Sequence, residues 1–308
     1  MQKVSGRAIF ALVVVCLIWG TTYLVNKLGV SRMPPLFFTT VRQLVAGTLI
    51  LIYFFVIRKN PWPDRKYFAK QIPLGILLIG VGNGVGTFGL QFIDSSISAI
   101  MAALSPVIIA IMTVYYKPED KLTPEGWLGI GAGFVGILII CYDKLQTPGD
   151  HSKLIIGLSL SFLSIACWAL GTVWSKNYSF PVSPFITAGF HMVFGGIPVA
   201  VLSFCLESWK SVHVGPDLII IWLYLIFFGS IVAYSAYIYA LKHLPATIVS
   251  IQSYINPIIA LILGAVILHE PHNLKIISGA AITLLGVLLI NYSYIRSKRK
   301  KTNISFSE

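Results

Sequence analysis

The sequence predicts an all-α membrane protein of ten transmembrane helices, built from two inverted five-helix repeats. Composition is the first reason: 56% of the 308 residues are hydrophobic and 11% are charged, whereas soluble domains carry about 25% charged residues. The second reason is that charged residues and Pro, Gly and Asn clusters divide the chain into ten apolar runs. Each run matches the roughly 20 residues that a helix needs to cross a bilayer. The third reason is an internal duplication.

The ten apolar runs are continuous and long. They lack the alternation of period two over about ten residues that marks transmembrane strands, so we expect helices. The first run has no small-x-small cleavage site, and we expect it to stay attached to the chain. The runs cover approximately residues 7–28, 34–57, 70–92, 95–116, 124–142, 153–176, 183–206, 217–240, 245–268 and 273–294.

The two halves of the chain share residues at a nearly constant spacing. Residues 95–119 recur as residues 246–270, with Pro and Glu at matching positions. Because five is an odd number of crossings, the second half must enter the membrane from the opposite side. The sequence therefore predicts halves related by a pseudo-two-fold axis in the membrane plane. The matched pairs are Trp19 and Trp168, Lys27 and Lys176, Arg42 and His191, Pro106 and Pro257, Glu119 and Glu270, Gly129 and Gly279, and Gly136 and Gly286.

The loops and the distribution of charge predict boundaries and orientation. We expect a first repeat over residues 1–145, a second over 153–296 and a basic cytoplasmic tail over 297–308. If the N-terminus is cytoplasmic, 15 of the 23 Lys and Arg residues lie in cytoplasmic segments, an asymmetry that sets orientation. The net charge of +12 is therefore explained by topology, with no nucleic-acid partner. Both termini are expected in the cytoplasm of a bacterial cell, with the tail against anionic lipid headgroups.

Polar and aromatic residues within apolar helices are the candidates for function. Arg42 could bind a carboxylate with its planar guanidinium, or form an interhelical hydrogen bond. Gln252 corresponds to Met101 in the other half, a pair that would make a central cavity asymmetric. Any single aromatic side chain is equally well explained by helix packing. The candidate substrate-binding residues are Trp19, Arg42, Asn83, Met101, Ser105, Trp168, Tyr237, Gln252 and Asn256.

Four further residues are candidates for gating or for helix kinks. Pro106 and Pro257 each remove a backbone hydrogen bond in mid-helix, which predicts kinks beside the substrate or static packing kinks. Lys27 and Lys176 lie near helix ends, where they could reach the headgroups, form a gate or contact the ligand.

Ionisable residues and cysteines limit the chemistry. None of the 11 acidic residues is predicted in a membrane interior, where proton-coupled carriers commonly use a carboxylate. We therefore expect facilitated transport or exchange, unless His191 carries the proton; a neutral structural histidine is the alternative. The four cysteines lack metal-ligand spacing, and we expect no metal or other cofactor.

The chain resembles the drug/metabolite transporter superfamily and, within it, the EamA-type permeases. The motifs are Trp19-Gly20 and Lys27, the two proline-containing helices, the Tyr-Ala-Leu-Lys-His-Leu-Pro-Ala junction at 239–246, and Glu270 before the last helix. The resemblance covers residues 7–294. It implies a central cavity lined mainly by helices 1, 3, 4, 6, 8 and 9, and export of amino acids or other small metabolites.

The predicted function is thus a secondary transporter that exports amino acids or related metabolites by alternating access, and not an enzyme. Its expected partners are a small-molecule substrate and the lipid bilayer, with a homodimer left open. A membrane-embedded enzyme acting on lipid-linked substrates would need an interfacial cluster of His, Asp, Glu or Ser. A channel would need a continuous polar pore. Neither pattern is found in the sequence.

Overall fold

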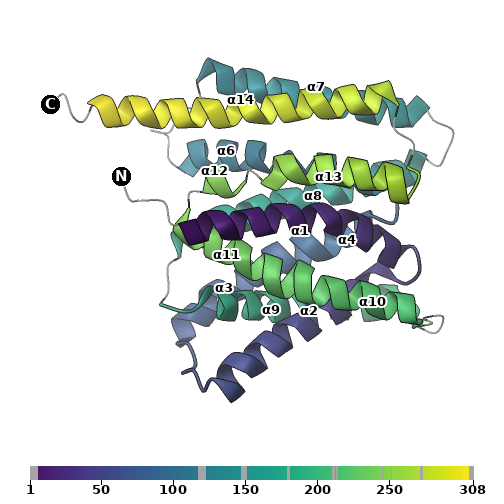
Figure 1. Cartoon of the computed structure of the whole chain (residues 1–308), viewed down its shortest axis with the longest axis vertical. Helices are drawn as coiled ribbons and strands as arrows, with labels where there is room; N and C mark the ends of the chain where they lie inside the picture. The colour runs from purple at the N-terminus through teal and green to yellow at the C-terminus, as the bar shows by residue number, and fades with distance from the viewer. Residues whose placement is uncertain are drawn as a thin grey trace.

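The computed structural model of the chain is a helical bundle (Figure 1). It describes residues 6–116, 123–146, 151–178, 181–209, 212, 214–244, 246–250, 252–270 and 273–304. In this part of the chain, six helical rods are long and apolar enough to cross a membrane, and four shorter apolar helices accompany them. No strand occurs among the described residues. The predicted fold class is confirmed, and the ten rods fall close to the predicted runs.

The first repeat begins at α1, and its third and fourth rods are each assembled from shorter pieces. The first five rods are α1 (Gly6–Val30), α2 (Pro35–Ile52) with the π-helical turn η1 (Tyr53–Ile57), the series α3 (Arg65–Gly75), η2 (Ile76–Val85) and α4 (Gly86–Gly89), the pair α5 (Ser95–Ala102) and α6 (Ser105–Tyr116), and α7 (Pro124–Gln146).

The second repeat has the same plan. Its rods are α8 (His151–Asn177), α9 (Pro184–Leu206), the series α10 (Pro216–Tyr224), η3 (Leu225–Val232) and α11 (Ala233–His243), the pair α12 (Ala246–Val249) and α13 (Gln252–Ile267), and α14 (Leu274–Ile304). The π-helical stretches η2 and η3 lie in equivalent rods, and the sequence analysis did not predict them.

Local sequence signals explain where several helices begin. Helices α2, α9 and α10 each start at a proline, which has no N–H to leave unpaired in the first turn. Asp64 caps α3 by accepting a hydrogen bond from the Tyr67 N–H at 2.8 Å. Helix α14 continues past the predicted end at residue 294 to Ile304, because Lys and Arg are good helix formers.

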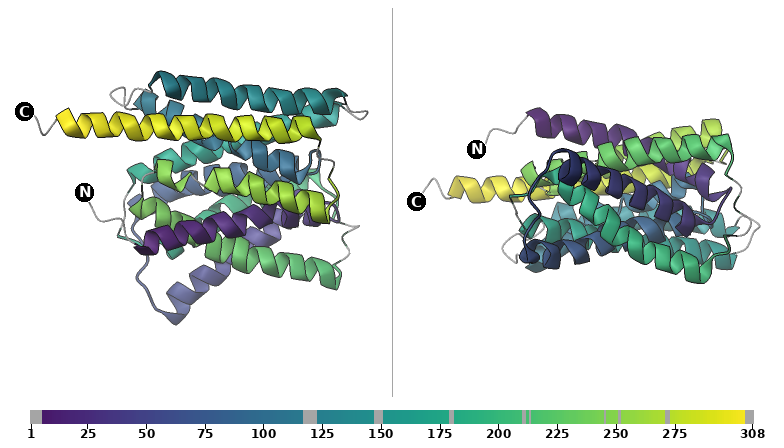
Figure 2. Two further views of the ribbon diagram at one scale, coloured as in Figure 1. Left: turned by 45° about the horizontal axis from the view of Figure 1, so that its top comes forward. Right: turned by 90° about the horizontal axis from the view of Figure 1, so that it is seen from below.

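The helices are arranged in layers between two outer pairs. In Figure 1, α7 and α14 form the layer at the top, and α2 and α9 lie toward the bottom. The left view of Figure 2 also shows α14 beside α7. Helix α1 begins and α14 ends at the same end of the bundle (Figure 1), which we call the terminal end. The other end is called the open end below.

The α7–α14 pair shows the two-fold relation between the repeats directly. A Cβ atom on Gly136 would lie 2.5 Å from the Gly279 carbonyl oxygen, and one on Gly286 would lie 2.5 Å from the Gly129 carbonyl oxygen. These contacts exchange equivalent residues, as a two-fold axis requires, and they allow close backbone approach.

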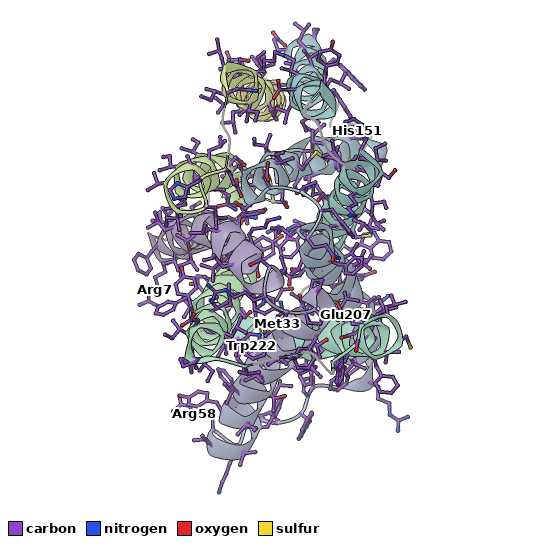
Figure 3. All side chains as sticks on the ribbon, turned by 90° about the vertical axis from the view of Figure 1, so that its right-hand side faces the viewer. Arg7, Met33, Arg58, His151, Glu207 and Trp222 are labelled. Carbon is purple, nitrogen blue, oxygen red and sulfur yellow. The ribbon has the colours of Figure 1, made fainter. Side chains whose placement is uncertain are left out.

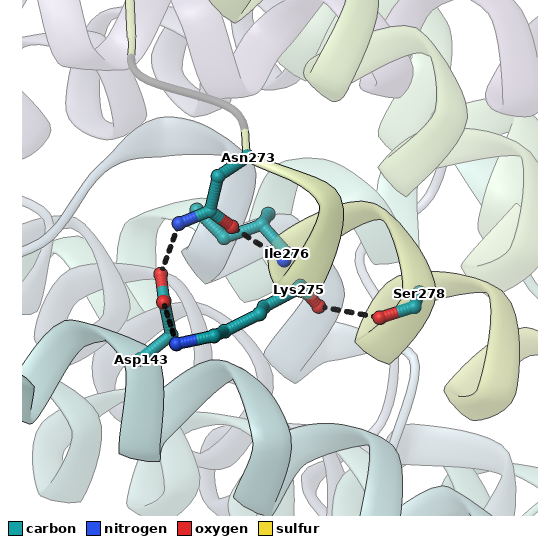
Figure 4. A network of polar contacts seen from close by, with 5 residues as sticks. All are labelled: Asp143, Asn273, Lys275, Ile276 and Ser278. Carbon is teal, nitrogen blue, oxygen red and sulfur yellow. Dashed lines mark hydrogen bonds and ion pairs between the residues drawn. The ribbon is translucent and has the colours of Figure 1, made fainter.

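The same pair of helices is tied together by polar contacts at the open end (Figure 4). Asn273 Nδ2 donates to Asp143 Oδ2 at 2.7 Å, and Lys275 Nζ lies 3.4 Å from Asp143 Oδ1. Asn273 Oδ1 also accepts the Ile276 N–H at 2.9 Å, which caps the start of α14.

Candidate functional site

A cavity of about 150 Å³, here called the main cavity, lies between the two repeats. It extends from the middle of the bundle toward the open end, where Asn26, Leu90 and Ser98 line it. Figure 3 views the molecule from this end, with the helices seen along their axes. The polar lining residues are Thr22, Tyr23, Asn26, Arg42, Gln43, Asn83, Thr87, Ser98, Ser105, Ser161, Ser164, Ser230, Tyr234, Gln252, Ser253 and Asn256.

Arg42 brings a buried positive charge to this cavity. Its Nη1 donates to Asn26 Oδ1 at 2.7 Å, and its Nη2 donates to Asn83 Oδ1. Gln43 Nε2 also donates to Asn83 Oδ1, at 2.9 Å. Arg42 is only 4% exposed, and among the described residues no carboxylate forms an ion pair with it. Because buried charges are normally paired, this wall of the cavity favours an anion.

Arg42 and two amide side chains at the main cavity each have one polar atom without a hydrogen bond in the described part of the chain. The Nε of Arg42 and the Oε1 of Gln43 are buried and have no hydrogen-bond partner among the described residues. The same holds for Gln252 Oε1 across the cavity. Arg42, Gln43 and Gln252 all line the main cavity, and within the described structure each keeps one buried polar atom unpaired in the cavity wall.

A proline and a helix end add backbone acceptors to the same space. Pro257 has no N–H, so the carbonyl of Ser253, four residues earlier in α13, loses its usual helical donor. Ala102 is the last residue of α5, and its carbonyl is at a helix end, where no helical donor follows. Ala102 and Ser253 both line the main cavity and are 151 residues apart. Equivalent residues of the two repeats, each with a carbonyl that lacks a helical donor, therefore line the cavity.

Four aromatic rings form the floor of the main cavity, on the side of the terminal end. The ring centroids of Trp19 and Trp168 are 5.4 Å apart, and Tyr237 lies 5.1 Å from Trp19 and 5.3 Å from Trp168. Tyr234 completes this aromatic floor. Since Trp19 and Trp168 are repeat equivalents in contact, the pseudo-two-fold axis passes between them.

Polar contacts fix the floor, and an apolar cluster closes the bundle behind it. Trp19 Nε1 donates to the Gly229 carbonyl oxygen in η3 at 3.1 Å, and the Tyr237 hydroxyl is 2.6 Å from Thr172 Oγ1. The residues packed behind the floor are buried and include Leu12, Val15, Ile238, Leu241 and Leu244.

Lys27 and Lys176 make equivalent contacts to the backbone. Lys27 Nζ donates to the carbonyls of Leu90 and Ile93 at 2.7 and 2.6 Å. Lys176 Nζ donates to the carbonyls of Leu241 and Leu244 at 2.7 and 2.8 Å. Each lysine thus supplies donors to the carbonyls at the end of a rod, where the helix itself supplies none. In this conformation both ammonium groups face backbone carbonyls.

His191, the equivalent of Arg42, is fully buried (0% exposed). Its Nδ1 is 2.9 Å from the Tyr234 hydroxyl and its Nε2 is 2.6 Å from Gln71 Oε1. The amide oxygen is an acceptor, so Nε2 carries the proton and Nδ1 accepts from Tyr234. This arrangement fits a neutral histidine that joins α9 to two other rods.

The structure brings most of the candidate residues to one place. Trp19, Arg42, Asn83, Ser105, Trp168, Gln252 and Asn256 line the main cavity. Tyr237 does not line it, but packs against Trp19 and Trp168, which do. Met101 does not line it, and packs instead in an apolar cluster with Ile130 and Ile140 of α7. The fourth rod breaks after Ala102, whereas the ninth breaks after Val249. These breaks are not equivalent, which explains why Gln252 and Met101 face different surroundings.

The two prolines also differ in their surroundings. Pro106 follows directly on the break between α5 and α6, whereas Pro257 lies inside the continuous helix α13. Glu119 lies outside the described residues. The sequence analysis missed Asn26, Gln43 and Ser164 as lining residues. Gln43 could have been found as the neighbour of Arg42, but a lone serine in an apolar helix carries little signal.

An all-helical bundle of two inverted repeats around a polar cavity is the architecture of a secondary transporter. The model of the EamA-like transporter family matches residues 6–142 and again residues 155–292. The chain therefore belongs to the EamA-like transporter family, and the predicted resemblance is confirmed.

Relatives named as transporters span most of the chain. An uncharacterized inner membrane transporter, YedA of Escherichia coli K12, is 30% identical over 260 residues, which are 83% of this chain and 80% of the relative. The uncharacterized transporter YoaV of Bacillus subtilis is 24% identical over 301 residues, 95% of this chain and 99% of the relative. A protein of known crystal structure shares the fold, with a TM-score of 0.68, 17% identity, and coverage of 94% of this chain and 98% of that one.

Proposed function

We propose that this protein exports amino acids or related small carboxylates across a bacterial inner membrane by alternating access. In this proposal the substrate occupies the main cavity, and the two repeats rock to expose it to one side at a time. The excess of Lys and Arg in the segments at the terminal end supports cytoplasmic termini. The open end then faces away from the cytoplasm.

The observation that carries the proposal is the buried guanidinium of Arg42 without a carboxylate partner at the cavity wall. A guanidinium binds a carboxylate through two parallel hydrogen bonds. Gln252 Oε1 and the carbonyl of Ser253 on the opposite wall could accept hydrogen bonds from an amino group. A small amino acid would thus satisfy both walls, and the aromatic floor would contact its apolar part.

The test uses purified protein in detergent and in proteoliposomes, with a panel of amino acids and the corresponding amino-acid amides. The amides keep the amino group and the side chain but lack the carboxylate. We expect amino acids to raise the thermal midpoint and to show saturable counterflow, and the amides to do neither. Counterflow also separates a carrier from a channel.

Arg42→Gln is the decisive variant, and Arg32→Gln is its control. Losing a charge-assisted hydrogen bond costs about 2 kcal/mol, or roughly 30-fold in affinity, so Arg42→Gln is expected to bind the amino acid at least that much more weakly. Arg32 is exposed and pairs with Asp217 on the surface, and its replacement is expected to leave affinity unchanged. Wild-type affinity and carboxylate preference in a folded Arg42→Gln protein would contradict the proposal.

A further inference from the structure

A second cavity, of about 80 Å³, lies on the other side of the aromatic floor. Its lining includes Gln71, Ser175, Lys176, Ile238 and Leu241. Gln71 lies in the first turns of α3, and the other four lie in the last turns of α8 and α11. The rods cross the bundle in alternating directions, so all of these segments are at the terminal end. The second cavity and the main cavity therefore lie toward opposite ends of the bundle.

The repeat symmetry relates the second cavity to the outer part of the main cavity. Ser175 is the equivalent of Asn26 at a spacing of 149 residues, and Ile238 and Leu241 are the equivalents of Thr87 and Leu90 at 151. Asn26, Thr87 and Leu90 line the main cavity. The lysine contacts fix this register independently, because equivalent lysines bind the carbonyls of Leu90 and Leu241.

A thin barrier separates the two cavities. Tyr234 lines the main cavity, and Ile238, one helical turn further along α11, lines the second. Between them, Tyr237 packs 6.0 Å from Tyr234 and 5.3 Å from Trp168. His191 joins Tyr234 of the main cavity to Gln71 of the second cavity. One layer of rings and one histidine, together with the apolar side chains packed behind the floor, therefore close the path.

We propose that the second cavity is the closed mouth of the translocation path toward the terminal end, and that Trp168, Tyr234 and Tyr237 are its gate. This inference rests on the proposed transport function. The pseudo-two-fold axis between Trp19 and Trp168 relates the second cavity to the outer part of the main cavity. In the opposite conformation the second cavity therefore widens and the outer part of the main cavity closes.

The composition of the two gates also sets which conformation is favoured at rest. The equivalents of Tyr234 and Tyr237 in the first repeat are Asn83 and Gly86, 151 residues earlier. The gate formed at the open end would therefore lack both tyrosine rings and their contacts, which stabilise a packed barrier. The conformation closed toward the terminal end is thus the resting state, and weakening the tyrosine gate shifts the population away from it.

The test compares the equivalent positions Thr87→Cys and Ile238→Cys, each in a background without the native cysteines. Purified protein in detergent is reacted with a hydrophilic maleimide, which reaches both ends. Thr87 and Ile238 are both buried in this conformation, at 4% and 6% exposure, so the rate of each single-cysteine protein is the reference for its own position. Adding Tyr237→Ala is expected to speed labelling at Ile238→Cys by about fivefold or more and to slow it at Thr87→Cys, because lost ring contacts shift the two states in opposite senses.

Two further variants keep the test decisive. Thr172→Val removes the partner of the Tyr237 hydroxyl, together with the bond that Thr172 Oγ1 donates to the Trp168 carbonyl oxygen. It is nearly isosteric and is expected to change both rates in the same senses as Tyr237→Ala. Ile140→Ala opens a buried position in α7, away from both cavities, and is expected to change neither rate. Unchanged rates in folded Tyr237→Ala and Thr172→Val proteins, or faster labelling at both cysteines, would overturn the inference.

The labelling experiment needs no substrate, so it separates this inference from the proposed function. Reciprocal labelling in a protein that moves none of the tested amino acids would leave the gate in place and defeat the proposed substrate. Carboxylate-selective counterflow together with labelling rates that Tyr237→Ala leaves unchanged would support the proposed substrate and contradict the gate.

Discussion

Glu270 joins the two repeats at the open end, and its replacement by Gln measures how much that contact stabilises the bundle. Its Oε1 accepts from the Ser95 N–H at 2.8 Å and from Ser95 Oγ at 2.6 Å. Its Oε2 accepts from the Ser96 N–H at 3.2 Å and from Ser96 Oγ at 2.7 Å. The carboxylate therefore caps the N-terminus of α5, where the helix dipole also favours a negative charge.

The size of the effect follows from which of these bonds survive. Glutamine keeps one acceptor oxygen and places an NH₂ group against the donors of one serine, so two of these four bonds are lost. Hydrogen bonds to a charged group contribute about 1.5 kcal/mol or more each, and rotation of the serine hydroxyl recovers part of the loss, so we expect Glu270→Gln to cost about 2 to 3 kcal/mol. Ser96→Ala removes one hydroxyl bond and is expected to cost about 1 kcal/mol.

The assay is reversible unfolding in mixed detergent with SDS, supported by the thermal midpoint. Asp217→Asn is the control, because Asp217 pairs with Arg32 on the surface and such pairs contribute about 0.5 kcal/mol or less. A double-mutant cycle of Glu270→Gln with Ser96→Ala is expected to show coupling, since the two side chains share a bond. If Glu270→Gln unfolds within about 0.5 kcal/mol of the control, or the cycle shows no coupling, the capping account is wrong.

Two further predictions concern the lysine contacts and the α7–α14 pair. Lys27→Met and Lys176→Met each remove the hydrogen-bond donors of two carbonyls. Each is expected to lower the free energy of unfolding by about 2 to 3 kcal/mol in the same SDS assay. A change close to zero would instead favour lysines that only reach the lipid headgroups. Gly136→Ala places a methyl group 2.5 Å from the Gly279 carbonyl oxygen and is expected to cost about 1 to 3 kcal/mol. Gly131→Ala, with nothing within 4 Å of its Cβ, is expected to be neutral or to stabilise by about 1 kcal/mol, so equal effects of the two alanines would contradict the packing.

The ten rods were predictable because the membrane imposes a length on every apolar run. Prolines and charged residues mark the ends of the runs, and α2, α9 and α10 each begin at a proline. The π-helical stretches were not predictable, because a wider turn changes the hydrogen-bonding pattern without changing the composition. The break between α5 and α6 next to Pro106 follows from proline chemistry, whereas α12 ends at Val249, away from Pro257.

The candidate site was predictable where the residue type is rare in a membrane. Arg42, Asn83, Gln252 and Asn256 are costly in lipid, and the structure places all four at the main cavity. Met101 was chosen only as the counterpart of Gln252, and the repeat symmetry does not extend to the surroundings of that pair. Symmetry is thus a better guide to the packing of the rods than to the residues that face the cavity.

Arg42 and His191 show how an asymmetric site arises on a symmetric scaffold. Both occupy equivalent positions, and each contacts the equivalent residue of the neighbouring rod, Asn83 for Arg42 and Tyr234 for His191. In the first repeat the small amide leaves space and a positive charge beside the cavity. In the second repeat the tyrosine fills the equivalent space and becomes part of the closed floor. The lysine and glycine contacts are shared by both repeats, so a duplicated bundle can open at one end or at the other. The cavity residues are not shared, so the same bundle can bind a ligand away from the pseudo-two-fold axis.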